Sequence, residues 1–183
     1  MATYPDQNHL LVATGYCEED CYFQLVKLNV HTGTKSYIVD IGTGKKLEFD
    51  WIQDLVWDDK NDQQVYVWDR ERLVKVNLNT GRVSTIYPTR VGSESKRYNT
   101  LQIDDAGNIY LHQVGNNQIE RLTYGEKNPV PIQFSGLDEL IDPVFSQFLY
   151  DKKSNAIFAI EFRDAVLYRF DLKSATMTNM FCK

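Results

Sequence analysis

The stretch that decides the fold is residues 52–87, which contains the four short segments IQDLVWDD (52–59), QVYVWD (64–69), LVKVNL (73–78) and RVSTIY (82–87). Apolar and polar residues alternate within these segments, and turn-forming residues such as Asn79-Thr-Gly81 separate them. Alternation with a period of two is typical of half-buried strands. The stretch therefore predicts four consecutive antiparallel strands joined by tight turns.

The same four-strand unit recurs along the chain. Copies begin at Asn99 and Ser146, and an earlier one covers His9–Asp40. The period is roughly 46 residues, within the range of β-propeller blades. We therefore expect an all-β fold of about four four-stranded antiparallel blades, in a single propeller-type domain over 1–183. The expected blades cover approximately 1–41, 51–88, 97–135 and 144–181.

The first copy is incomplete at its start. Tyr4-Pro-Asp-Gln7 resembles the tail of a first strand that is cut short. Two explanations remain open: the chain is a segment of a larger propeller, or it is an open array whose edge strands pair with another chain, as in a homo-oligomer. Residues 136–142 predict a short helical turn, and 42–46 and 90–96 predict polar loops between blades.

Composition narrows the class of protein. The formal net charge is −5, and Lys and Arg form no dense cluster, which argues against nucleic acid as a partner. No apolar run approaches the roughly 20 residues of a membrane span. The segment Met1–Asp6 is polar and is not a signal peptide. The chain is thus expected to be cytoplasmic, or to be the mature form of a secreted protein whose leader is missing.

The three cysteines are Cys17, Cys21 and Cys182. Cys17 and Cys21 flank a three-residue turn, and across a tight hairpin they could form a disulfide, which would indicate an oxidising compartment. Two reduced thiols on a loop are the other interpretation. A structural zinc site needs a second pair of ligands, which this motif lacks.

The order of apolar strand, Asp-rich turn, apolar strand and Asn-Thr-Gly turn resembles the broad superfamily of NHL, YWTD and lactonase-type propellers. Residues 52–134 and 146–181 carry this resemblance best. The YWTD tetrapeptide is absent, and the single Trp68-Asp69 lacks the rest of a WD40 motif. A fainter likeness is to secreted insect propellers that bind a small aromatic pigment.

This resemblance implies a functional site at the mouth of a central channel, where the first strand of each blade begins. In metal-dependent lactonase propellers, Glu, Asn and Asp at those positions bind a divalent cation. The matching residues here are Gln53, Asn99 and Ser146, which are neutral, whereas hard cations require carboxylate oxygens. A register slip of one residue would bring Asp54 inward instead. No catalytic residue and no cofactor are therefore predicted.

The positions of other polar and aromatic residues in the repeat predict their roles. Trp51, Tyr98 and Phe145 cluster at the blade entrances, and we expect some of them to line a binding surface. The recurring carboxylates are expected to cap hairpins, and the histidines do not form a metal-binding set. These carboxylates are Asp58, Asp59, Asp104, Asp105 and Asp151, and the histidines are His9, His31 and His112.

Two functional hypotheses follow. The first is a non-catalytic module that presents a propeller face to a protein, a peptide or a small aromatic ligand. The alternative is a metal-dependent hydrolase or lactonase-type propeller with a divergent calcium site. That site would use Asp54, Asn99 and a further carboxylate, either Glu48 or Asp142.

Overall fold

The computed structural model divides the chain into two compact units, residues 1–91 and 92–183. It describes residues 2–3, 8–17, 21–50, 52–58, 61, 63–69, 72–88, 90–91, 94–95, 98–113, 118–141 and 143–181. Within these ranges the regular structure is almost entirely β-strand, and no helix has the length and hydropathy of a membrane span. The predicted all-β fold class is confirmed.

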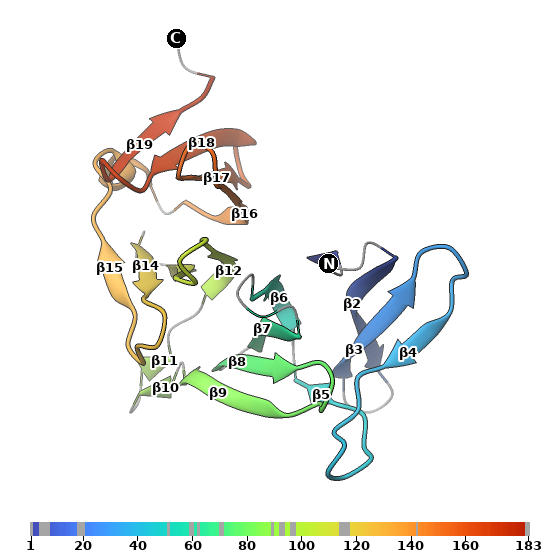
Figure 1. Ribbon diagram of the computed structural model, residues 1–183. Helices are drawn as coiled ribbons and strands as arrows, with labels where there is room; N and C mark the ends of the chain where they lie inside the picture. The colour runs from blue at the N-terminus through green and yellow to red at the C-terminus, as the bar shows by residue number, and fades with distance from the viewer. Residues whose placement is uncertain are drawn as a thin grey trace. The chain divides into compact units, whose positions relative to one another are not determined.

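The first unit contains two antiparallel sheets, which we call blades A and B (Figure 1). Blade A consists of β1 (Ala2–Thr3), β2 (His9–Cys17), β3 (Cys21–Asn29), β4 (Lys35–Tyr37) and β5 (Glu48–Phe49). Blade B consists of β6 (Ile52–Trp57), β7 (Gln64–Asp69), β8 (Arg72–Asn77) and β9 (Val83–Pro88). In both, each strand pairs with the next strand along the chain, except that β4 and β5 both pair with β3.

The second unit contains blades C and D, each with four strands in sequence order. Blade C consists of β12 (Tyr98–Ile103), β13 (Ile109–Gln113), β14 (Gln118–Leu122) and β15 (Val130–Ile132). Blade D consists of β16 (Phe145–Asp151), β17 (Ala156–Glu161), β18 (Val166–Asp171) and β19 (Thr176–Asn179). The predicted helical turn is the short 3-10 helix η1 (Leu137–Glu139) between them. Strands β10 (Arg90–Val91) and β11 (Glu94–Ser95) lie in the segment that joins the two units.

Blade A differs from its predicted form at both ends. Its first strand is β1, whereas Tyr4–Gln7 lies outside the described residues. Its fourth strand, β4, ends at Tyr37, before the predicted end of this copy at Asp40, and the outer strand continues as β5 after a hairpin closed by the Val39–Lys46 bridge. The Asp40 carboxylate starts this hairpin turn by accepting a hydrogen bond from the Gly42 amide (2.9 Å). The predicted polar loop 42–46 is therefore the turn and returning arm of a hairpin inserted into the outer strand.

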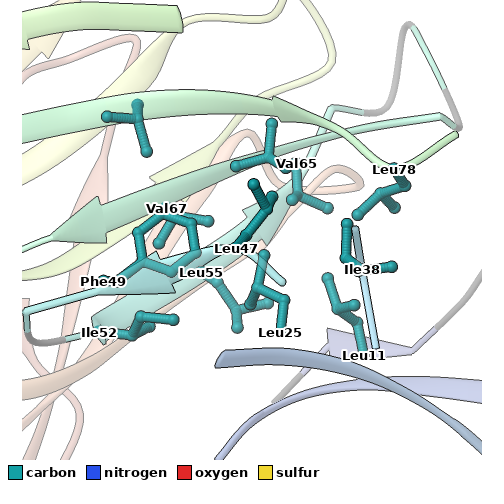
Figure 2. Packing of buried hydrophobic residues seen from close by; sticks show 12 residues of the cluster. Leu11, Leu25, Ile38, Leu47, Phe49, Ile52, Leu55, Val65, Val67 and Leu78 are labelled. Carbon is teal, nitrogen blue, oxygen red and sulfur yellow. The ribbon is translucent and has the colours of Figure 1, made fainter. Parts of the chain in front are cut away.

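Each unit is held together by the stacking of its two sheets. Within each unit, we call the side of the first blade that meets the second blade a forward face, and the side of the second blade that meets the first a rear face. In the first unit, Leu11 and Leu25 on the forward face of blade A pack in one cluster with the rear face of blade B (Figure 2). The rear-face residues of blade B are Leu55, Val65, Val67, Val74 and Val76.

The second unit repeats this arrangement with larger side chains. Tyr110 and Ile119 on the forward face of blade C pack with the rear face of blade D. The rear-face residues of blade D are Phe148, Ile157, Ala159, Tyr168 and Phe170. Burial of these apolar surfaces is the main favourable contribution to the stability of each pair of blades.

The hairpin turns follow one design. Asn29, Asn77 and Asp171 each end a third strand, and each accepts hydrogen bonds from the amides two and three residues later. After such an Asx turn the chain needs a residue with positive φ, which explains the Gly that ends the Asn79-Thr-Gly81 motif. Gly81 (φ 65°) supplies it in blade B, at a point where an added Cβ would lie 2.2 Å from the Val39 carbonyl oxygen.

Candidate functional site

A β-bulge interrupts the first strand of blades B, C and D at the same place. The strand register shifts between Ile52 and Asp54, between Tyr98 and Thr100, and between Phe145 and Gln147. The residues inside these shifts are Gln53, Asn99 and Ser146, which the sequence analysis placed at the channel mouth. Bulges redirect side chains and are frequent beside functional sites. The three candidates therefore occupy one equivalent position, and their role in binding stays a prediction.

The environments of these residues differ in detail. Gln53 and Ser146 are exposed, and the Ser146 hydroxyl donates a hydrogen bond to the carbonyl oxygen of Ile160 (3.2 Å). The backbone of Asn99 is described, but its side chain is outside the described set. Asp54 resumes the regular register opposite Trp68 and accepts a hydrogen bond from the amide of Leu55 (2.8 Å). Gln53, and not Asp54, thus occupies the bulge.

The aromatic residues at the blade entrances are interior. Tyr98 is 1% exposed and Phe145 is 0% exposed. The Tyr98 hydroxyl donates a hydrogen bond to the buried Glu120 carboxylate, and the Phe145 ring packs edge-on against His112 with centroids 4.8 Å apart. Trp51 lies outside the described residues. Tyr98 and Phe145 are thus packing residues here, and the expectation that they line an exposed surface is corrected.

The carboxylates that follow the first strands bind their own hairpins. Asp104 is 7% exposed and accepts hydrogen bonds from the amide and side chain of Asn108 (both 2.9 Å) and from the Tyr110 hydroxyl (3.0 Å). Asp151 accepts from the amides of Lys153 (3.2 Å) and Ser154 (3.1 Å). These carboxylates therefore have the structural role that their recurrence predicts. Asp105 instead forms an exposed ion pair with Lys152 (2.9 Å), and Asp59 lies outside the described residues.

In blade B the equivalent aspartate and tyrosine, Asp58 and Tyr66, are joined by a lysine side chain. Asp58 is 1% exposed, accepts a hydrogen bond from the Tyr66 hydroxyl (3.4 Å) and forms an ion pair with Lys75 (3.5 Å). The Lys75 ammonium lies 4.8 Å from the centroid of the Tyr66 ring. Burial lowers the pKa of Lys75, but Tyr66 and the charge of Asp58 outweigh this, so that its pKa is raised overall. The group stays a charged structural cation at neutral pH.

The equivalent tyrosine of blade C stays protonated for a related reason. Burial raises the pKa of the Tyr110 hydroxyl well above its usual range, and the neighbouring Asp104 carboxylate adds to the rise. The hydroxyl is therefore a permanent hydrogen-bond donor to Asp104 and not a proton-transfer group.

The histidines are spread over separate places. His9 lies 3.3 Å from the Asn29 side chain, and His31 lies 3.2 Å from that of Asn8. His112 is fully buried beside Phe145 and Phe148. In the portion of the chain that is described, no three His, Cys, Asp or Glu side chains gather closely enough to hold a metal ion.

The structure describes only some of the other residues proposed for a calcium site or a disulfide. Glu48 is exposed on β5 opposite Gln24, and Asp142 lies outside the described residues. The backbones of Cys17 and Cys21 are directly opposite at the end of the β2–β3 hairpin. Directly opposite residues lie within the Cα separation that a disulfide spans. The disulfide stays a prediction, since both side chains and Cys182 are outside the described set.

Two polar residues beside the bulges of blades C and D, Thr100 and Glu161, were not predicted from the sequence. The Thr100 hydroxyl, 2% exposed, accepts a hydrogen bond from the Phe148 amide of the next blade (3.1 Å). Glu161 accepts hydrogen bonds from the amides of Val144 (3.3 Å) and Asp164 (2.7 Å). Burial by itself raises the pKa of Glu161, but the hydrogen bonds from these amides lower the pKa by more than burial raises it. The pKa of Glu161 therefore lies below its ordinary value. The turn 161–165 has the same length as 151–155, and this spacing could have identified Glu161.

Comparison with known proteins gives structural matches alone. No family model and no curated protein matches the chain. An auxiliary nutrient-binding protein from Bacteroides thetaiotaomicron is similar with a TM-score of 0.68 and 11% identity, over 97% of this chain and 40% of that one. A catalytically inactive virginiamycin B lyase from Staphylococcus aureus, solved with quinupristin, has a TM-score of 0.57 and 12% identity, over 97% of this chain and 57% of that one.

A third match is the nidogen/laminin complex, with a TM-score of 0.60 and 11% identity over 90% of this chain and 62% of that one. The chain is built of β-propeller blades. It spans from two fifths to three fifths of the length of these matched structures. The comparisons lend no support to the likeness to insect pigment-binding propellers. At such low identity the similarity shows the fold alone.

Proposed function

We propose that this chain is a non-catalytic binding module, which presents the bulged first strands of its blades to a protein, a peptide or a small aromatic ligand. The observation that carries the proposal is the recurrent bulge at Gln53, Asn99 and Ser146. A bulge kept at one position in three copies of a repeat is a designed feature and not a defect of pairing. Two of its residues, Gln53 and Ser146, are exposed.

The chemistry of these positions supports binding over hydrolysis. An amide and a hydroxyl supply hydrogen bonds without charge, which suits the recognition of peptide groups or of the polar atoms of a small ligand. Asp104 and Asp151 lie at the opposite ends of the first strands from the bulges and accept hydrogen bonds from their own turns, so they do not add charge at these positions. Among the matched structures are a nutrient-binding protein and a laminin complex, which fit a binding role, and a lyase, which does not.

Selection of displayed random peptides on the purified protein tests the proposal. Enriched peptides should lose at least tenfold in affinity for a Gln53→Ala, Ser146→Ala double variant, since two exposed hydrogen-bonding groups are removed. Thr178→Ala is the matched control, because it deletes an exposed hydroxyl on the outer strand β19. Peptides that bind all three proteins equally, or a selection without enrichment, would contradict the proposal.

A calcium titration separates the two functional hypotheses. A specific calcium site saturated a hundredfold above its dissociation constant adds about 2.7 kcal/mol to the free energy of unfolding. The binding proposal expects the same melting temperature in excess calcium and in chelator. A calcium-dependent rise that Asp54→Asn abolishes would favour the hydrolase alternative instead.

A further inference from the structure

A histidine of blade A is hydrogen-bonded to the residue that closes a hairpin turn. His9, the first residue of β2, pairs with Asn29, the last residue of β3, and its Nε2 lies 3.3 Å from the Asn29 amide nitrogen Nδ2. The Asn29 oxygen Oδ1 accepts hydrogen bonds from the backbone amides of His31 (3.0 Å) and Thr32 (2.9 Å). One side-chain amide therefore joins the turn 29–34 to the neighbouring strand β2.

These partners determine which atom of Asn29 faces His9. The oxygen must face the two turn amides, because a backbone amide can only donate. The equivalent Asp171 in blade D, whose side chain has only acceptor oxygens, accepts from the amides of Lys173 and Ser174 in the same way. Nδ2 of Asn29 is therefore the atom that faces His9, and since Nδ2 donates, Nε2 of His9 must accept. A neutral His9 consequently carries its proton on Nδ1.

A protonated His9 does not fit this arrangement. Both ring nitrogens of a charged imidazole are donors, so the Nε2 proton would meet the Nδ2 protons of Asn29. Turning the Asn29 amide over would give His9 an acceptor, but it would then present Nδ2 to the amides of His31 and Thr32. At least one hydrogen bond is lost in either case. The closed turn and a charged His9 therefore exclude each other.

The charged side chains described on the surrounding elements do not offset a charge on His9. Lys27, two residues before Asn29, lies on the same forward face of blade A, and His31 lies in the turn itself. The β4 residue that pairs with Lys27 is a neutral serine. Blade B meets this face with aliphatic side chains, and its acidic Asp69 ends β7, whereas His9 begins the equivalent strand β2. The charges closest to His9 along these strands are thus basic.

We infer that His9 is a pH-sensitive switch, which holds the turn 29–34 against β2 when it is neutral and releases the turn when it is protonated. Histidine changes its charge between about pH 8 and pH 5. The stabilisation of the turn is therefore present above this range and is lost as the pH falls through it. The equivalent pairs, Gln64 with Asn77 in blade B and Ala156 with Asp171 in blade D, contain no histidine. This inference does not depend on the proposed binding function.

A long-range proton–nitrogen NMR correlation of the isotope-labelled protein tests where neutral His9 carries its proton. At about pH 8 the spectrum should show His9 with a protonated Nδ1 and an unprotonated Nε2, because Nε2 accepts from Asn29. A major form with the proton on Nε2 would overturn the inference, since His9 would then not accept a hydrogen bond from the turn.

Amide hydrogen exchange tests the release of the turn. The amides of Asn79 and Thr80, which donate to Asn77 in the equivalent turn of blade B, serve as the internal reference. Relative to these, the protection of the His31 and Thr32 amides should fall about fivefold between about pH 8 and pH 5, as expected for the loss of one hydrogen bond.

Two variants assign the effect to one histidine. His9→Gln gives blade A the uncharged pair that blade B has, so the relative protection should stay constant with pH. His31→Gln is the matched control, because it removes the other histidine of the turn, and its Thr32 amide should respond to pH as in wild type. A relative protection that does not change with pH in wild type, or that falls equally in His9→Gln, would overturn the inference.

Discussion

The Thr100 hydroxyl accepts a hydrogen bond from the backbone amide of Phe148 at 3.1 Å, across 48 residues of sequence. Thr100 directly follows the bulge of blade C, and Phe148 lies just beyond the bulge of blade D. The bond therefore joins the first strands of the two blades next to their bulges. The bond also gives the buried Phe148 amide, on the edge strand β16, a hydrogen-bond acceptor outside its own sheet.

Replacing Thr100 by Val should destabilise the protein by about 1–3 kcal/mol, because the shape is kept while the buried Phe148 amide loses its acceptor. The change should appear as a lower urea midpoint with an unchanged slope. Thr100→Ser keeps the hydroxyl and is the matched control, with a loss of about 1 kcal/mol for the deleted methyl. A Thr100→Val variant as stable as wild type would mean that the hydrogen bond contributes nothing.

Gly81 and Gly33 permit a matched comparison of backbone strain with steric conflict. Both occupy the left-handed region, with φ of 65° and 69°, in equivalent turns that begin at Asn77 and Asn29. A Cβ on Gly81 would lie 2.2 Å from the Val39 carbonyl oxygen, whereas a Cβ on Gly33 would meet nothing within 4 Å. Gly33→Ala should thus cost about 1–2 kcal/mol from strain alone.

Gly81→Ala should cost clearly more, about 3 kcal/mol or above, because the backbone of the 38–47 segment must also move. Thermal unfolding of the two variants in parallel measures the difference. The same loss for both would show that the contact between Gly81 and Val39 is looser than the structure has it.

The strands were predictable from sequence because their signal is local. The segment 64–69 was predicted with the bounds that β7 has, since alternation and turn residues determine it without knowledge of neighbouring strands. The hairpin inserted after Tyr37 was missed. In the segment Val39–Lys46 the alternation of apolar and polar residues is too weak to tell a continuous strand from a hairpin. Short polar hairpins leave little periodicity to detect.

The candidate site was only partly predictable, since it depends on bulges and on packing between sheets. Gln53, Asn99 and Ser146 were found as equivalent positions of a repeat, but nothing in their residue types indicates a bulge. Some of Trp51, Tyr98 and Phe145 were expected to line a binding surface, because aromatic residues are common at such surfaces. The burial of Tyr98 and Phe145 depends on the partners Glu120 and His112, which lie on other strands and are not adjacent in sequence.

Ala165 is a site where a single change should stabilise the protein. It has φ of 54°, in the left-handed region that costs an L-residue about 1–2 kcal/mol. Glycine removes this strain but adds about 0.5–1 kcal/mol of unfolded-chain entropy, so Ala165→Gly should gain about 0.5–1 kcal/mol. The control is Asn155→Gly, at φ 48°, which should be neutral or slightly destabilising because Asn tolerates this region and Asn155 accepts a hydrogen bond from Tyr150 (3.2 Å). A melting temperature lowered by Ala165→Gly would contradict the prediction.

Asp171 should make stability depend on pH in the acid range. Hydrogen bonds from the Ser174 amide, and then from Arg169, lower the pKa of Asp171 from 3.8 to about 2. Because the pKa of the folded state lies below that of the unfolded state, the stabilisation is present above pH 3.8 and is lost as the pH falls towards 2. Asp171→Asn keeps the Asx turn, as Asn29 and Asn77 do in the equivalent turns, but removes the charge that Arg169 contacts (2.9 Å).

Urea unfolding of wild type and Asp171→Asn from acid to neutral pH measures this effect. The two proteins should differ most above about pH 5 and converge as the pH approaches that of the folded-state pKa. The carboxyl carbon shift of Asp171 in an NMR titration provides a second measurement that does not depend on the stability of the variant, and it should titrate below the range of an ordinary aspartate. A constant difference in stability across the whole range, together with an ordinary titration, would show that the Ser174 and Arg169 contacts do not hold the carboxylate in solution.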